Sequence, residues 1–266
     1  MWDIIDDFVC ENLYLIDKIE RMKPGLILLL LCTFFIACKP DQSDTQGVSD
    51  LIIKVNNSVG NQAVQYGQMI YMNNAGNKYK VNLLKYYLSN FVFTQEDGSQ
   101  FRASNYELID AFDSTTCYLQ FKNVPQGKYT SLQFGVGIDS MRNHTGLQED
   151  DLDPLHGMIW TWNTGYIFFK HEGQFLDANM SPQQLLYHFG TDKAYTQIQL
   201  ALPSVDIRDA SKTLHIDFDL NALYNIPNEI NFIDNNIHES LSADDSKWMK
   251  EMQDNFKQSF SFIKVE

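Results

Sequence analysis

Short apolar runs with strict two-residue alternation constrain the fold of this chain more than any other feature. The clearest case is Thr213–Leu220, where Leu214, Ile216, Phe218 and Leu220 alternate with polar residues. Successive side chains of a strand point to opposite faces, so this pattern predicts a strand with one buried face. On its other, solvent-facing side we expect the intervening polar residues His215, Asp217 and Asp219.

Further runs of this kind occur at roughly the spacing of strands in a β-sandwich. They include LIIKVNNSVG, YELIDA, CYLQFKNV, YTSLQFGVGI and TQIQLAL. The pair Asp97-Gly98 between FVFT and FRA predicts a hairpin, and Pro125-Gln126-Gly127 predicts another turn. The chain has no internal repeat and no break in composition. We therefore predict one all-β domain, a Greek-key β-sandwich or barrel, over residues 51–266.

Helical periodicity is confined to the C-terminal part of the chain. Apolar residues at helical spacing follow Ser242, at positions Trp248, Met249, Met252 and Phe256. Ser242 can cap the first turn, where Asp244 and Asp245 complement the helix dipole. The sequence thus predicts a short C-terminal helix.

The N-terminal region has the pattern of a lipoprotein signal. The apolar run Leu26–Ile36 follows Lys23 and leads to Cys38. It is shorter than the roughly 20 apolar residues that a membrane-spanning helix needs. We interpret residues 22–38 as a lipoprotein signal peptide in which Cys38 becomes lipidated, so that two or more acyl chains anchor the mature protein.

The segments on either side of this signal fit the same interpretation. Residues 1–21 are rich in acidic side chains, unlike a signal, so we predict a misannotated start and translation from Met22. Residues 39–50, KPDQSDTQGVSD, have the composition of a linker. Lys39 rather than Asp after the cysteine favours the outer membrane. The expected location is the cell envelope, on an outer-membrane lipoprotein facing the periplasm or the surface.

Charge and cysteine content exclude several classes of function. The formal net charge of −14 leaves no basic stripe for phosphates, so we expect no nucleic-acid binding. Cys10 and Cys32 are lost with the leader and Cys38 is lipidated, which leaves Cys117 without a disulfide partner. Its strand-like surroundings favour a buried, inert thiol over a copper ligand of the electron-transfer type.

The segment Asp139–Gly173 concentrates scarce, chemically active residues. It contains His144, His156 and His171, together with Trp160 and Trp162. If Met158–Trp162 is a strand, the thioether of Met158 and both indoles lie on one face. Such a face suits a soft or borderline metal, or oxidation of an indole, whereas aromatic packing in a β core is the common alternative.

Several motifs in this region and beyond resemble one known family. They are GVGIDSMRNHTG, LDPLHGMIWTWNTGY and YHFG, supported by KYYLSNF, YELIDA and VPQGKYTSLQFGVG. In order and content they resemble the MbnP-like domain, named for a periplasmic copper-binding protein associated with methanobactin systems. The resemblance runs from about Leu51 to Ile263.

The resemblance implies a copper site and a modified tryptophan. His144 and His188 match positions where copper-binding members of the family place histidines, and Met158 is a further candidate ligand. Some members resemble a substrate whose tryptophan is oxidised to kynurenine by a partner di-haem, peroxidase-like enzyme, and the product helps to bind copper. Trp160 and Trp162 are both candidates. The loop Asn143–Asp153 departs from that of copper-binding members in its length and acidity.

Other residues are weaker candidates for function. Surface or second-shell roles are expected for His156 and His171, and His238 could act with Met249 or Met252. The acidic run LQEDDLDP lacks the glycine and glutamate of an EF-hand loop, so a solvated loop is expected. The pair Asp217/Asp219 could serve a glycosidase only with an acid–base partner that the sequence does not reveal.

Three classes of function follow from these observations. The first is a lipid-anchored copper-binding protein that acts in copper acquisition or handling and is not an enzyme. The second is a non-metal binding or interaction lipoprotein on the same β-sandwich scaffold. The third is an enzyme, for which no phosphate-binding loop, nucleophile elbow or metalloprotease helix is present in the sequence.

Overall fold

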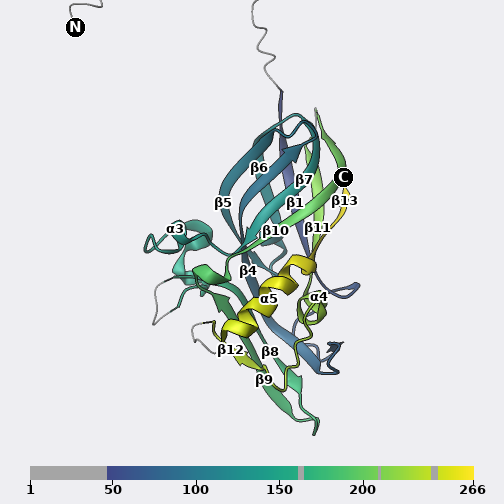
Figure 1. The fold of residues 1–266 in the computed structure, drawn as a ribbon, viewed down its shortest axis with the longest axis vertical. Coiled ribbons are helices and arrows are strands. Elements are labelled where there is room, and N and C mark those ends of the chain that lie inside the picture. The colour runs from purple at the N-terminus through teal and green to yellow at the C-terminus, as the bar shows by residue number, and fades with distance from the viewer. Residues whose placement is uncertain (1–46, 161–164, 209–210, 241–244) are drawn as a thin grey trace, which may run out of the picture. The chain divides into compact units, whose positions relative to one another are not determined.

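Two packed β-sheets form the core of the protein (Figure 1). The computed structural model describes residues 47–160, 165–208, 211–240 and 245–266. The first sheet has the order β13-β11-β1-β2, and β6 also pairs with β1. Its strands are β1 (Val48–Val59), β2 (Gln62–Ala63), β6 (Tyr118–Pro125), β11 (Lys212–Asp219) and β13 (Phe260–Val265).

The second sheet is larger and is organised around one long strand. Its order is β10-β7-β4-β8-β9-β12, and β3 and β5 also pair with β4. Its strands are β3 (Tyr71–Met72), β4 (Lys78–Gln95), β5 (Gln100–Asp110), β7 (Gly127–Val136), β8 (Ile167–Leu176), β9 (Pro182–Gly190), β10 (Thr196–Ile207) and β12 (Ile237–His238).

Strand β4 connects two regions of this sheet. Its first half pairs with β8 from Tyr79 to Tyr86, and its second half pairs with β7 from Leu88 to Gln95. Asn90 lies near the junction with a positive φ of 54°, beside irregularities in the pairing with both neighbours. As a result β8, β9 and β12 extend away from the region where β5, β7 and β10 lie (Figure 1).

Helices and short turns complete the described part of the chain. The helices are α3 (Ser140–Asn143), α4 (Leu220–Asn225) and α5 (Ser246–Ser259), and the 3₁₀ turns are η1 (Ser114–Cys117), η2 (Asp150–Leu152), η3 (Pro154–His156) and η4 (Asp192–Ala194). None of the helices in these residues is long and apolar enough to cross a lipid bilayer.

Aromatic side chains fill the space between the two sheets. Phe218 of β11 lies 4.8 Å, between ring centroids, from Tyr86 of β4 and 4.8 Å from Phe260 of β13. Phe91 of β4 approaches Phe121 of β6 to 5.0 Å. Rings at these separations bury large apolar areas and interact edge-to-face or stacked, so they hold the sheets together.

The prediction of an all-β sandwich is confirmed, as are most of the predicted local elements. The Asp97-Gly98 hairpin joins β4 to β5, with Gly98 at φ +87°. The turn at Gln126 instead carries the chain from one sheet to the other, because β6 pairs with β1 and β7 with β4. The C-terminal helix begins at Ser246, and the proposed cap Ser242 lies outside the described residues.

Strand β11 differs from its prediction in one respect. Leu214, Ile216 and Phe218 are buried as expected, but His215 is also buried, at 7 % exposure. The strand lies between β1, with which it pairs in parallel, and β13. The side chain of Glu266 at the end of the chain covers His215, with 3.2 Å between Nε2 and Oε2, so the expected open face is partly closed.

Candidate metal centre

A short hairpin carries Met158 and Trp160. The amide of Ile167 donates to the Met158 carbonyl at 2.8 Å, and the amide of Trp160 donates to the Gly165 carbonyl at 3.3 Å. Ile159 forms a single bridge with Tyr166. Met158 and Trp160 are 1 % and 5 % exposed, which fits the side-chain alternation of extended backbone. Trp162 lies outside the described residues.

His188 is the candidate ligand closest to this hairpin. It lies on β9, opposite Lys170 of β8. Its imidazole is 13 % exposed, and its ring centroid is 5.9 Å from that of Trp160. Nε2 is 2.9 Å from Glu172 Oε1, whereas Nδ1 is 4.0 Å from Glu239 Oε1. Three neighbouring strands thus place an imidazole between two carboxylates and beside a buried indole.

Burial determines the protonation state of His188. Loss of solvent lowers the pKa of its imidazole, and the hydrogen bond to Glu172 opposes this effect without cancelling it. The Lys170 ammonium lowers the pKa further. A neutral imidazole has one protonated nitrogen and one with a free lone pair, which is the form that binds metals.

His144 lies in a different environment, directly after helix α3. Its Nε2 is 3.0 Å from both carboxylate oxygens of Asp192, in the η4 turn that follows β9. Asp192 also accepts hydrogen bonds from Asn143 Nδ2 at 2.8 Å and from Ser140 Oγ at 2.5 Å. Burial acts to raise the pKa of Asp192, but these hydrogen bonds outweigh it and hold the pKa below its usual value.

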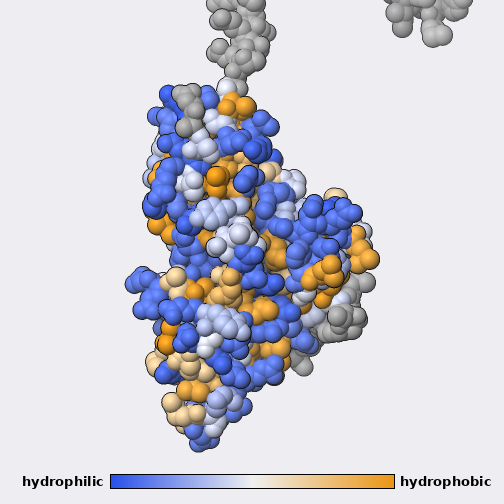
Figure 2. All heavy atoms as spheres, turned by 180° about the vertical axis from the view of Figure 1, so that it is seen from behind, coloured by the Kyte–Doolittle hydropathy of each residue, from blue (hydrophilic) through white to orange (hydrophobic). Residues whose placement is uncertain are grey.

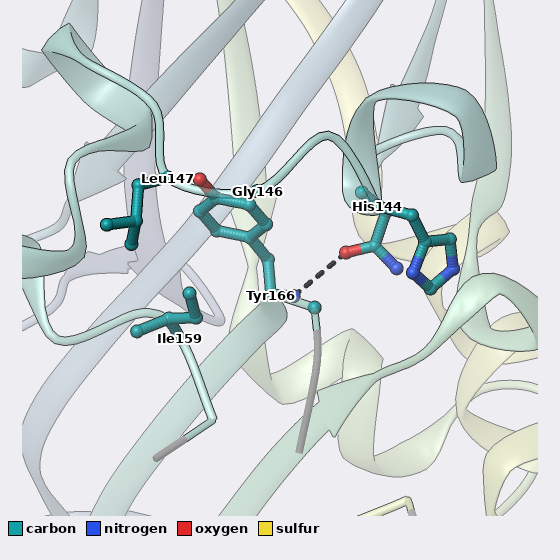
Figure 3. A pocket seen from close by; sticks show the side chains of 7 residues that line it. His144, Gly146, Leu147, Ile159 and Tyr166 are labelled. Carbon is teal, nitrogen blue, oxygen red and sulfur yellow. Dashed lines mark hydrogen bonds between the residues drawn. The ribbon is translucent and has the colours of Figure 1, made fainter. Parts of the chain in front are cut away.

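A cavity of about 420 Å³ adjoins His144 (Figure 3). Asn143 closes one side, because its Oδ1 accepts the Tyr166 amide hydrogen at 2.8 Å. The side chains of Leu147 and Ile159 face the ring of Tyr166 in this view. The residues that line the cavity are Asn143, His144, Gly146, Leu147, Ile159, Gly165 and Tyr166.

The hairpin therefore separates two environments. Ile159 lines the cavity beside His144, while Trp160, on the alternate face, contacts His188. His144 and His188 each pair with a carboxylate of their own. Met158 belongs to the hydrophobic core. Within the described ranges, no group of three or more His, Cys, Asp or Glu side chains is clustered so as to hold a metal ion.

The remaining histidines differ in burial and in partners. His171 is fully buried, so the expectation of a surface role is wrong, while a second-shell role stays a prediction; Tyr224 Oη is hydrogen-bonded to its Nδ1. The ring of His238 stacks on Trp248 at 4.3 Å, and its Nδ1 is 2.6 Å from Asp245. The exposed His156 contacts the carbonyl of Asp150 at 3.0 Å.

Other candidate residues have structural contacts. Cys117 is a buried free thiol whose pKa burial raises, as expected for an inert group. In the acidic loop, Asp151 Oδ2 accepts the Leu108 amide hydrogen at 2.7 Å. Asp217 accepts a hydrogen bond from Ser58 at 2.6 Å, and Asp219 accepts one from the Gly60 amide at 2.8 Å. These carboxylates thus connect segments distant in sequence.

Three carboxylates of the candidate centre were missed by sequence reasoning: Glu172, Asp192 and Glu239. The contacts of Glu172 and Glu239 depend on the register of β8 with β9 and on the parallel pairing of β12 with β9, whereas Asp192 meets His144 through the η4 turn. Glu172 lies sixteen residues from His188 along the chain, and no short motif connects them. Only the alternation of KHEG in β8 indicates that Lys170 and Glu172 share a face.

Comparison with known proteins gives two matches. The MbnP family matches residues 48–243. Among solved structures, MbnP from Methylosinus trichosporium is similar, with a TM-score of 0.45 and 16 % sequence identity over 68 % of this chain and 79 % of that chain. No curated protein matches the sequence.

Proposed function

The chain belongs to the MbnP family, and on this premise we propose that it is a copper-binding protein of the cell envelope. The family is associated with methanobactin and copper handling. We propose a role in copper acquisition or handling, as a binder and not as a catalyst. The observation that carries the proposal is the contact between His188 and Trp160, with the imidazole held by Glu172.

The donor chemistry of this face suits copper. Imidazole nitrogen and thioether sulfur are ligands that copper accepts, and low-coordinate Cu(I) needs only two or three. In proteins, a metal-binding histidine usually donates its other N–H to a carboxylate or carbonyl oxygen. The carboxylates Glu172 and Asp192 are in position to accept from His188 and His144 respectively. We propose His188 as the ligand beside Trp160, with Met158 as a further candidate. His144 lies in the separate environment beside the cavity, so its membership of the same site is a question for the titration.

Oxidation of Trp160 supplies the missing donors in this proposal. Indole lacks a lone pair suited to a metal, whereas kynurenine carries a ketone and an aromatic amine. Trp160 is the candidate that the structure describes, with its ring centroid 5.9 Å from that of His188, whereas Trp162 lies outside the described residues. The proposed partner is a di-haem, peroxidase-like enzyme that uses two equivalents of peroxide to open the indole to N-formylkynurenine. Hydrolysis then releases the former C2 as formate and leaves kynurenine. Lipidation of Cys38, outside the described residues, would keep this chain at the membrane.

A copper titration tests the ligand assignment. The chain from Lys39 onward is titrated with Cu(I) against a competing chelator, alongside His144→Ala and His188→Ala. We expect one-to-one binding that His188→Ala weakens tenfold or more, about 1.4 kcal/mol. A loss of the same size in His144→Ala would place both histidines in one site. His156→Ala removes an exposed histidine that contacts the carbonyl of Asp150 and is the matched control. Binding that neither substitution alters would place the site elsewhere.

The alternative is a non-metal interaction lipoprotein on the same scaffold. It is favoured by three large apolar side chains that are 81–91 % exposed, of which Leu147 lines the cavity: Met141, Leu147 and Leu155. Polar residues cover most of the face in Figure 2, with apolar atoms gathered in smaller patches. Large apolar side chains at the surface are typical of interaction sites where they form a contiguous patch. Failure of the titrated chain to bind copper, with Trp160 also intact in protein from the cell, would support this alternative.

A further inference from the structure

The ring of His188 faces a different carboxylate at each nitrogen. Glu172 Oε1 is 2.9 Å from Nε2, within hydrogen-bond distance. Glu239 Oε1 is 4.0 Å from Nδ1, beyond that distance. The two glutamates are similarly exposed, at 39 % and 46 % of their side chains. Among the residues that the structure describes, the ring is thus hydrogen-bonded on one side only.

This asymmetry selects one tautomer of the neutral ring. An ionised carboxylate can only accept hydrogen bonds, so the nitrogen that faces Glu172 must carry the proton. Lys170 Nζ lies 3.5 Å from the same Glu172 oxygen and balances its charge. The proton then resides on Nε2, and Nδ1 retains its lone pair on the side where β12 and Glu239 lie.

We infer that Glu172 is a positioning residue that fixes His188 as the Nε2–H tautomer and makes Nδ1 its metal-binding nitrogen. The part of this inference that concerns the metal rests on the proposed function. A carboxylate in this position also increases the basicity of the ring, and loss of such a partner typically weakens metal binding 10- to 100-fold.

Packing alone cannot produce this selection. Trp160 contacts the ring at 5.9 Å between centroids and a tilt of 58°, which restricts the orientation of the imidazole. An apolar contact of this kind does not distinguish which nitrogen carries the proton, because the two tautomers have the same shape. The tautomer is therefore a readout that a purely structural role of Glu172 would leave unchanged.

The test uses the full chain labelled with ¹⁵N-histidine, free of copper, at about pH 8, above the usual histidine pKa. The ¹⁵N shifts of His188 identify the protonated nitrogen. We expect protonation at Nε2 in the wild type and a mixture of both tautomers in Glu172→Ala. Glu239→Ala, the same change on the other side of the ring, is expected to retain the Nε2–H form. Backbone amide spectra establish that each variant is folded.

Two results would overturn the inference: protonation at Nδ1 in the wild type, or an unchanged tautomer in Glu172→Ala. The wild-type spectrum alone can overturn the inference even if a variant does not fold. A copper titration of the same variants forms the second arm, with a loss of 10- to 100-fold expected for Glu172→Ala. Because the tautomer is measured without copper, failure of copper binding in the wild type contradicts the proposed function and leaves the tautomer assignment standing.

Discussion

A single buried histidine is expected to lower the free energy of unfolding by about 1.4 kcal/mol for each pH unit that the pH decreases below about 6.5. The residue is His171, whose pKa burial lowers from 6.5 to about 3. In this range the unfolded chain binds a proton at His171 that the folded chain does not. Stability from this group is therefore complete above pH 6.5 and is lost progressively down to about pH 3, about 5 kcal/mol in all.

Urea unfolding at several pH values measures this contribution. Carboxylates also titrate in the range, so the comparison is between wild type and His171→Asn, whose amide can still meet the Tyr224 hydroxyl. Just below pH 6, we expect the free energy of unfolding of His171→Asn to change with pH less steeply than that of the wild type, by about 1.4 kcal/mol per pH unit. Tyr224→Phe removes the partner and leaves His171 in place, so it should retain the wild-type slope. Equal slopes in wild type and His171→Asn would contradict the argument.

Phe218→Ala is expected to destabilise the fold by about 3–5 kcal/mol, the usual cost of truncating a buried phenylalanine. Phe218 has no exposed surface, and its ring joins the sheets through Tyr86 and packs on Phe260. Its ring also lies 6.2 Å from Phe256 of α5. Truncation leaves a cavity where strands from both sheets meet the helix, and the surrounding backbone cannot close it.

The measurement is the midpoint of urea unfolding at neutral pH. Phe112→Ala is the matched control, because Phe112 is 37 % exposed and contacts Tyr66 at the surface. Surface substitutions of this kind usually change stability by about 0.5 kcal/mol or less. A similar loss in both variants would mean that Phe218 does not occupy the central position described here.

The local elements of this fold were predictable where the sequence pattern and the burial agree. The alternation around Phe218 predicted β11, and Asp97-Gly98 predicted the β4–β5 turn, because both signals act over a few residues. The parallel pairing of β1 with β11 was not predictable, since its partners are far apart in the sequence. The contact of His215 with Glu266 was not predictable for the same reason, because the two residues are far apart in the sequence.

The candidate centre was predictable only in part. His188, His144 and Trp160 were found from the motifs that contain them, but the role of each depends on its neighbours. Trp160 contacts His188 because the hairpin folds onto the β8–β9 edge of the sheet. His144 instead meets Asp192 beside a cavity on the alternate face. Strand register, which determines these contacts, leaves little trace in a single sequence.

The proposed copper-binding role is tested most directly on protein isolated from the membranes of the cell that makes it. Metal analysis gives the copper content, and tandem mass spectrometry gives the masses of the peptide with Trp160 and of the N-terminal peptide. We expect one copper per chain, kynurenine at position 160 and lipid on Cys38. Protein that carries no copper and an intact Trp160 would contradict the proposed role.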